Sequence, residues 1–410
     1  MLLDRISSWM TALAYKDPHE NCFSYGTRPS PQPQRGGHSV FFAMANHFSQ
    51  KHQVMAIYDD ARQGLPLYSY NSSVELVNLA IPIHFPSYKL VKVRRELIRA
   101  SEKLLGFPKN YNALTKMRQE LVADALKGTL NAFQPDICIA FNMSDLRSIA
   151  LATVPTRTFP IITMCHTDTH RVFPKLASYE RDIVKHSDVF QVLLDEYQAP
   201  VKRLTSAPVV TIGNVIPQLE DSSTCTEPKL VYIARLEENK RQHKLIEAIA
   251  KVPKEVRNGW ILHLFGNVAN EGYVQGLKRL IASKQLTEVV KIEGVTDQPY
   301  AELLNSSICC FPSAFEGFGL ALGEAMAAGL PCVAFDDCSG LSRQIKHGHT
   351  GYLESSVDSM ADTLSELMQN RELRLTVGQQ AKESVRRYSA EHIWSKWETL
   401  LEETIRHEKK

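Results

Sequence analysis

The sequence lacks the features of several special classes of protein. None of its eight cysteines is paired in a C-x-x-C spacing, which argues against a structural zinc site. No run approaches the roughly 18 consecutive apolar residues that a membrane-spanning helix needs. The first residues have neither the basic start nor the long apolar centre of a secretion signal. The net charge is only +2, which argues against a dedicated nucleic-acid-binding protein.

What remains is the profile of an ordinary globular protein. Hydrophobic residues make up 44% and charged residues 22% of the 410 positions, enough for two or three domains with cores. The cysteines stand mostly in apolar, strand-like runs, which predicts reduced, buried thiols and a cytoplasmic location. Further apolar runs of strand length predict buried strands. In the first half of the chain they lie at 52–58, 136–141, 159–165, 189–194 and 209–212.

The most informative stretch of the chain is 307–353. An apolar run at 308–311 predicts a buried parallel strand, and 321–328 is a strong helix former that ends at Gly329. The loop between them contains two glycines and leaves the carboxyl end of a strand. Such a loop presents backbone N–H groups at a helix N-terminus, where a phosphate is stabilised. Glu316 before the helix and Glu324 about one turn inside it would border the same pocket and suit sugar and ribose hydroxyls.

The spacing Glu316-x7-Glu324, with Glu-Gly-Phe-Gly after a Pro-Ser strand end, resembles the signature of family 4 glycosyltransferases. The resemblance implies the α/β fold called GT-B. In that fold two Rossmann-like, doubly wound domains face each other across a cleft, and a C-terminal helix crosses back to the first domain. The family is retaining and depends on a nucleotide sugar, which would be a UDP- or GDP-sugar here.

The segment 229–241 carries a second part of the resemblance. It is similar to the family motif Gly-Arg-Leu-x-x-x-Lys-Gly, with Ala234 in place of the first glycine and Arg241 in place of the last. By this resemblance Arg235 and Lys240 would donate hydrogen bonds to the diphosphate, whose charge must be stabilised as it leaves. Glu316 would hold the donor sugar and Glu324 the ribose hydroxyls. The implied backbone donors are those of Gly317, Phe318, Gly319 and Leu320.

The first half of the chain resembles the family more weakly. The segment 1–15 is predicted to be a short amphipathic helix, and 21–25 a first strand. Gly36 and Gly37 then open a helix at 40–51, as in the family's glycine loop, whose amides face the donor phosphates or the acceptor. His166 ends the strand 159–165 and is similar to a histidine that lies beside the donor sugar in the family. The predicted catalytic residues are therefore Glu316, His166, Arg235 and Lys240.

The segment 87–116 combines many lysines and arginines with an apolar stripe at helical spacing that includes Val93 and Leu97. This pattern is typical of a basic amphipathic helix on an anionic membrane or acceptor. A solvated helix that packs by its apolar stripe has the same pattern, so both interpretations stand.

The predicted division of the chain follows from these motifs. Residues 1–217 form an acceptor-binding domain, 218–228 a polar linker, 229–387 a nucleotide-sugar-binding domain, and 388–410 a helix that packs back on the first domain.

The predicted function is retaining transfer of a hexose-type sugar to a glycan or glycolipid hydroxyl, in polysaccharide or lipopolysaccharide synthesis. No cofactor is expected. No metal is expected either, because no Asp-x-Asp motif stands at a strand end. The alternatives are a nucleotide-sugar epimerase on the same fold and a member that binds the donor without transferring it. Peripheral membrane contact is a further expectation, and nucleic acid is not an expected partner.

Overall fold

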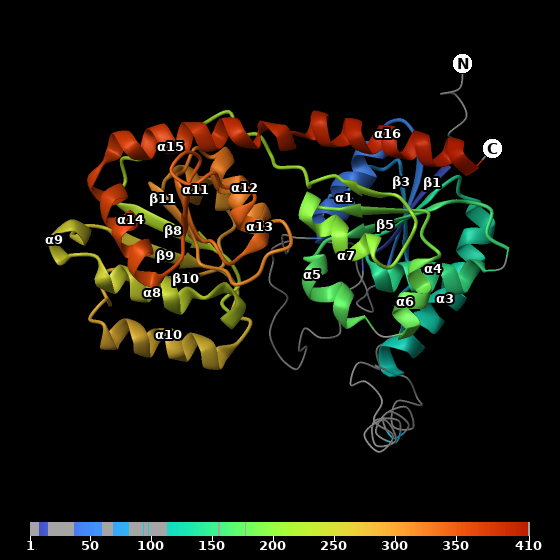
Figure 1. The fold of residues 1–410 in the computed structure, drawn as a ribbon, viewed down its shortest axis with the longest axis horizontal. Coiled ribbons are helices and arrows are strands. Elements are labelled where there is room, and N and C mark those ends of the chain that lie inside the picture. The colour runs from blue at the N-terminus through green and yellow to red at the C-terminus, as the bar shows by residue number, and fades with distance from the viewer. Residues whose placement is uncertain are drawn as a thin grey trace. The chain divides into compact units, whose positions relative to one another are not determined.

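The computed structural model describes residues 8–14, 37–59, 69–81, 93, 97, 113–154, 156–176 and 178–408 (Figure 1). The chain divides into two compact units. One unit consists of Met1–Ile212 and Trp394–Lys410, and the other is Gly213–Ile393. The boundaries expected from the sequence, at 217, 228 and 387, stay predictions.

The first unit is built on a seven-stranded parallel sheet with the order β3-β2-β1-β4-β5-β6-β7. Each residue of β4, β5 and β6 is buried, as expected for strands covered on both faces. The five apolar runs of this half therefore predicted five of its strands correctly. The strands are β1 Ser8–Ala14, β2 Gln53–Tyr58, β3 Val74–Asn78, β4 Cys138–Ala140, β5 Ile161–Cys165, β6 Val189–Val192 and β7 Val209–Thr211.

The prediction of a helix at 1–15 is wrong. Residues 8–14 form β1, which pairs in parallel with β2 on one side and β4 on the other. Hydrogen bonds to two neighbouring strands outweigh a local helical spacing of apolar residues, because strand preference depends on tertiary context. The predicted first strand at 21–25 lies outside the described residues. The edge strand β3 was not predicted, since only its first residue, Val74, is buried and no continuous apolar run marks it.

The helices of the first unit follow its strands. Among them α1 Gly37–Phe48 agrees with the helix predicted at 40–51. Most of the basic segment 87–116 lies outside the described residues. Within it, Val93 and Leu97 are helical and expose 57% and 66% of their surface. The other helices are α3 Ala113–Phe133, α4 Met143–Thr153, α5 Thr169–Val172, α6 Ser178–Val184 and α7 Gln198–Lys202, with short 3-10 turns at Phe173–Lys175 and Asp195–Tyr197.

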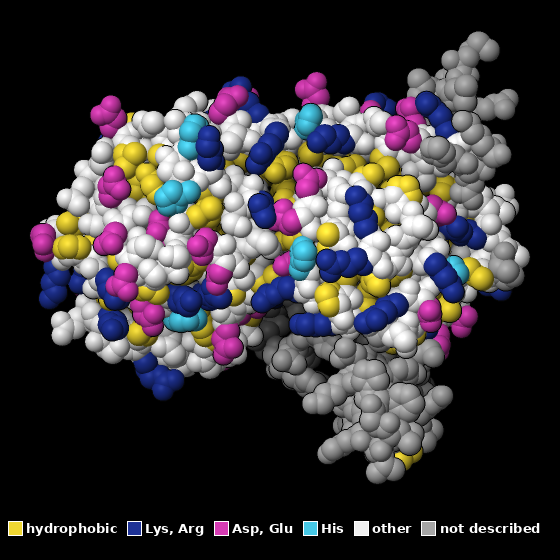
Figure 2. Space-filling model, viewed as in Figure 1, with side chains coloured by type: hydrophobic (Ala, Val, Ile, Leu, Met, Phe, Trp, Pro, Cys, Tyr) yellow, Lys and Arg dark blue, Asp and Glu magenta, His cyan; other side chains and the backbone are white. Residues whose placement is uncertain are grey.

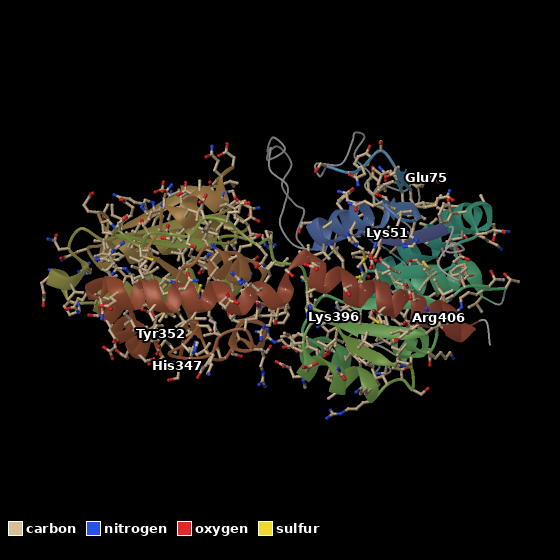
Figure 3. All side chains as sticks on the ribbon, turned by 90° about the horizontal axis from the view of Figure 1, so that it is seen from above. Lys51, Glu75, His347, Tyr352, Lys396 and Arg406 are labelled. Carbon is tan, nitrogen blue, oxygen red and sulfur yellow. The ribbon has the colours of Figure 1, made fainter. Side chains whose placement is uncertain are left out.

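The last helix, α16 Ala390–Glu408, joins the first unit through its residues from Trp394 onward. Trp394 stacks on His47 of α1 with ring centroids 5.0 Å apart. Lys51 Nζ donates to Glu398 Oε1 at 2.7 Å, so Lys51 lies beside the helix that carries Lys396 and Arg406 (Figure 3). The prediction that the C-terminal helix returns to the first domain is therefore confirmed.

The second unit is built on a six-stranded parallel sheet with the order β10-β9-β8-β11-β12-β13. Helix α8 packs against α10 and α14, and α12 packs against α15. Acidic and basic side chains are interspersed on the face of this unit that Figure 2 shows. The strands are β8 Lys229–Ile233, β9 Ile261–Phe265, β10 Val290–Gly294, β11 Ile308–Phe311, β12 Cys332–Phe335 and β13 Tyr352–Glu354. The helices are α8 Gln242–Lys251, α9 Lys254–Arg257, α10 Glu271–Ser283, α11 Pro299–Leu304, α12 Leu320–Ala327, α13 Ser339–Ser342, α14 Val357–Gln369 and α15 Arg371–Ser384, with 3-10 turns at Glu238–Lys240 and Val385–Tyr388.

Within the described ranges, no helix combines the length and the apolar character that a membrane crossing requires.

Candidate active site

The candidate site lies in the second unit, at the carboxyl ends of β8 and β11. The strand order reverses between these two neighbours, because β9 and β10 lie on one side of β8 while β12 and β13 lie beyond β11. Loops that leave two such strands diverge, and ligands of open parallel sheets bind in the crevice between them. Arg235 and Lys240 follow β8, and Glu316 follows β11. The topology therefore brings both halves of the predicted motif to one edge of the sheet.

Lys240 and Glu316 form an ion pair between the loops that follow β8 and β11. Lys240 Nζ donates to Glu316 Oε1 at 2.6 Å, and the two side chains are only 14% and 22% exposed. Asn239, next to Lys240, ties the same loops together. Its amide donates to Phe315 O at 3.1 Å, and its carbonyl accepts from Ala314 N at 2.8 Å. Two residues predicted separately from motifs far apart in the sequence are thus held in contact.

Arg235 lies in the same loop but has a different partner. Its Nη2 is 3.1 Å from Glu237 Oε1, and its side chain is 41% exposed. Its carbonyl accepts a hydrogen bond from the buried Gln242 at 2.8 Å, which fixes the backbone of the loop. The guanidinium is therefore in a more solvated position than the Lys240 ammonium.

Arg241 occupies the last glycine position of the motif and shows why glycine suits it. Its backbone is in the left-handed region, with φ 46° and ψ 36°, where most side chains are strained. Two contacts of the Arg241 guanidinium hold it there: Nη1 lies 2.9 Å and 2.7 Å from the carboxylate oxygens of Asp337. This pair joins the loop after β8 to the loop after β12.

The glycine loop 317–320 is held by close backbone contacts. Gly319 has φ 82° and precedes α12, so it supplies the positive φ that turns the chain into the helix. The buried Gln344 donates to Phe318 O and, at 3.0 Å, to Gly340 O. Gly340 itself abuts the backbone of Glu316, since a Cβ built on it would lie 2.2 Å from Glu316 O. These contacts fix both Glu316 and the amides that follow it.

Glu324 is placed differently from Glu316. It is 8% exposed inside α12 and accepts from the Tyr300 hydroxyl at 3.3 Å. Tyr300 belongs to α11, directly after the turn 295–298. Sequence reasoning did not single out Tyr300, because a lone tyrosine after a turn carries no motif.

Two further residues of the site were also missed. Ser313 Oγ donates to Glu316 Oε1 at 2.8 Å, and Tyr232 lies behind it with its hydroxyl 2.7 Å from Ser313 Oγ. The Pro-Ser strand end is part of the motif, but no sequence pattern indicates that its serine contacts the glutamate.

In the first unit, His166 is the predicted site residue that can be described in full. Its ring stacks on Phe141 with centroids 5.6 Å apart, and its Nε2 is buried with no hydrogen-bond partner among the described residues. Burial lowers the pKa of His166 to about 4, so the imidazole is neutral near pH 7. Gly36 lies outside the described residues, and Gly37 is the first residue of α1.

The pKa of His166 predicts a loss of stability in acid. Because the folded pKa lies below the ordinary value of 6.5, the unfolded chain binds the proton more readily between these two values. The free energy of unfolding should therefore fall by up to about 3 kcal/mol as pH drops from 6.5 to 4. Urea unfolding of His166→Gln should show a shallower fall than the wild type. The exposed His392→Gln is the control, and equal slopes for all three proteins would contradict the prediction.

The cysteines and acidic residues suggest no metal or redox centre in the described part of the chain. The seven described cysteines are all buried and unpaired, as predicted, and burial raises their thiol pKa values, that of Cys165 to about 12. No group of three or more His, Cys, Asp or Glu in this part of the chain is arranged to hold a metal ion.

Comparison with known proteins relates the second unit to a family. Residues 220–384 match the family model described as glycosyl transferases group 1. N-acetyl-alpha-D-glucosaminyl L-malate synthase of Bacillus anthracis is 30% identical over 187 residues, 45% of this chain and 48% of that protein. Poly(ribitol-phosphate) alpha-N-acetylglucosaminyltransferase of Staphylococcus aureus (strain COL) is 34% identical over 180 residues, 43% of this chain and 36% of that protein. The matches thus span less than half the length of these relatives.

Solved structures of similar fold cover nearly the whole chain. A variant of S. aureus TarM in complex with fondaparinux, alpha-GlcNAc-glycerol and UDP has a TM-score of 0.69 at 16% identity, over 96% of this chain and 99% of that chain. Anabaena HepE in complex with UDP and glucose has a TM-score of 0.67 at 16% identity, over 97% of this chain and 100% of that chain. At this level of identity the likeness concerns the fold, and it confirms the predicted GT-B class.

Proposed function

We propose that the protein is a retaining glycosyltransferase, from the premise that residues 220–384 match the family model of glycosyl transferases group 1 and that the chain has the GT-B fold. It moves a sugar from a nucleoside-diphosphate sugar to the hydroxyl of a glycan or glycolipid. The observation that carries the proposal is the ion pair between Lys240 and Glu316 at the point where the strand order reverses. A diphosphate beside the cation would place the attached sugar beside the carboxylate.

The proposed roles follow the chemistry of each group. Lys240 and Arg235 stabilise the charge of the departing diphosphate, aided by the backbone N–H groups of 317–320. Glu316 holds hydroxyls of the donor sugar, and Glu324 accepts from the ribose. His166, neutral near pH 7, would supply a hydrogen bond to the donor sugar rather than a positive charge.

We propose transfer on one face of the sugar. The bond from the anomeric carbon to the diphosphate oxygen breaks while the acceptor oxygen bonds to the same face of that carbon. The acceptor proton passes to the departing phosphate oxygen, so atoms and charge balance without a protein nucleophile or a metal. What the protein must supply is positioning and stabilisation of the leaving charge.

The named neighbours support a UDP-sugar as the donor to test first, since the TarM and HepE complexes both contain UDP. The relative that acts on poly(ribitol-phosphate) supports an acceptor from cell-surface polysaccharide synthesis.

Incubation with a panel of UDP- and GDP-sugars tests the proposal. Release of the nucleoside diphosphate should require an acceptor, here a glycolipid extract, and should persist with a metal chelator present. Isomerised sugar without diphosphate release would identify an epimerase. Donor binding without any turnover, with every acceptor fraction, would identify a binding protein instead.

A cytoplasmic protein that contacts the membrane is the second part of the proposal. Its support is the basic segment 87–116, where Val93 and Leu97 are exposed apolar side chains. Vesicles that contain anionic phospholipid should carry the wild type upward in a flotation gradient. Neutralising Arg94 and Arg95 to serine should reduce the floated fraction several-fold, because each basic residue near such a surface contributes about 1 kcal/mol. The exposed pair Arg386 and Arg387, replaced in the same way, is the matched control. Equal flotation of both variants would end this part of the proposal.

A further inference from the structure

A chain of buried hydroxyl groups leads to the Glu316 carboxylate. Tyr232 comes from β8 and is 1% exposed, and Ser313 follows β11 and is fully buried. The two strands are neighbours in the sheet, with Ile308 opposite Leu230 in their register. The Tyr232 hydroxyl is 2.7 Å from Ser313 Oγ, and Ser313 Oγ is 2.8 Å from Glu316 Oε1. The sheet itself therefore supports the carboxylate from behind.

The direction of these hydrogen bonds follows from the number of hydrogens. An ionised carboxylate only accepts, so the single hydroxyl hydrogen of Ser313 goes to Glu316. Ser313 then has only lone pairs to offer Tyr232, and Tyr232 must donate. Burial raises the pKa of Tyr232 well above its ordinary value, and the negative charge of Glu316 raises it further. The phenol therefore keeps its proton.

The two donors to Glu316 meet at one of its oxygens. Ser313 Oγ and Lys240 Nζ both bond Oε1, and no hydrogen bond from the described residues is made to Oε2. Because Oε1 is held from two sides, the plane of the carboxylate is fixed and Oε2 is left for another donor. A sugar hydroxyl is such a donor.

We propose that Ser313 and Tyr232 are positioning residues that orient the Glu316 carboxylate so that Oε2 receives a hydroxyl of the donor sugar. The inference rests on the proposed function and deepens it. When the Lys240 ammonium donates a hydrogen bond to the diphosphate, Ser313 is the donor that keeps Oε1 in place. This pair of hydroxyl groups, Tyr232 and Ser313, which we call the relay, thus acts on recognition of the sugar. Other groups recognise the nucleotide.

The test compares two ligands that differ only in the sugar. Calorimetry gives the affinity of each variant for UDP and for the UDP-sugar that the wild type binds best. The affinity for the UDP-sugar divided by the affinity for UDP measures how much the sugar contributes to binding. Ser313→Ala should lower this ratio about tenfold, the value of one hydrogen bond to a charged group, and leave the affinity for UDP unchanged. The buried Ser306 lies at the other end of β11 and donates to Glu302 O at 2.6 Å, so Ser306→Ala is the matched control.

A double variant separates positioning from stability. Ser313→Ala leaves the buried Tyr232 hydroxyl without its partner, so its Tm should fall. Adding Tyr232→Phe removes that hydroxyl, and the Tm of the double variant should recover at least in part. The sugar contribution should stay low in the double variant, because Glu316 still lacks its donor. A ratio that recovers together with Tm would show a merely structural role and overturn the inference.

The outcomes also separate this inference from the proposed function. If the wild type binds neither UDP nor GDP nor their sugars, the proposed function fails. If it binds them and Ser313→Ala keeps the wild-type ratio, only the role of the relay fails.

Discussion

Lys240→Met is expected to lower kcat/KM for sugar transfer by at least about a hundredfold, as the loss of one group that stabilises leaving charge commonly does. The substitution keeps the length and the apolar stem of the side chain and removes only its cation. It also leaves the Glu316 carboxylate, which is 22% exposed, without its ion-pair partner beside the diphosphate position. Two unfavourable effects therefore act on the same step. Steady-state kinetics with a saturating acceptor measure the change.

The control for this result is Lys251→Met. Lys251, at the end of α8, pairs with Asp358 of α14 on the surface, where both partners are at least half exposed, so the substitution removes a lysine ion pair of which neither member is a predicted site residue. It should leave kcat/KM within about twofold, since such surface pairs contribute little. Arg235→Ala should have an intermediate effect of roughly tenfold, because its guanidinium is 41% exposed. A Lys240→Met enzyme as active as the Lys251 control would remove Lys240 from the diphosphate site.

Gly340→Ala is expected to reduce transfer by roughly a hundredfold, although the residue carries no chemistry. The new Cβ would lie 2.2 Å from Glu316 O and 2.8 Å from its carbonyl carbon, so the loop must move. Displacement of a positioning group by about 1 Å can cost a hundredfold in rate. The backbone cannot yield as a flexible side chain would, and Tm should fall as well.

Gly276→Ala is the matched substitution for that experiment. Gly276 lies within α10, and a Cβ there would meet nothing within 4 Å. Alanine should therefore raise the free energy of unfolding by about 0.4–1 kcal/mol and leave the kinetics unchanged. Thermal unfolding and steady-state kinetics of both variants measure these changes in stability and in the rate of transfer. Wild-type activity in Gly340→Ala would mean that the contact with Glu316 is not needed to place the carboxylate.

The strands and part of the site could be predicted because their signals are local. A continuous apolar run marks a strand buried on both faces, and this identified β4, β5 and β6 without any knowledge of their neighbours. Two motifs, each placed directly after such a strand, also put Lys240 and Glu316 at one predicted site, and the structure shows the two side chains in contact.

The errors have a common physical origin in contacts between distant residues. The segment 1–15 shows a helical spacing of apolar residues, and only the pairing of 8–14 with β2 and β4 makes that part a strand. Ser313 contacts Tyr232 of β8, which is far from it in the sequence. Neither the strand pairing nor the Ser313–Tyr232 contact can be predicted from the neighbouring residues in the sequence.

The division of the chain has a consequence for synthesis. The first unit includes Trp394–Lys410, yet the whole of Gly213–Ile393 stands between this segment and the rest of the first unit in the sequence. A ribosome therefore delivers every residue of the second unit before it delivers the piece that completes the first. We expect the second unit to fold first, while the face of α1 on which Trp394 packs stays uncovered until α16 has been synthesised.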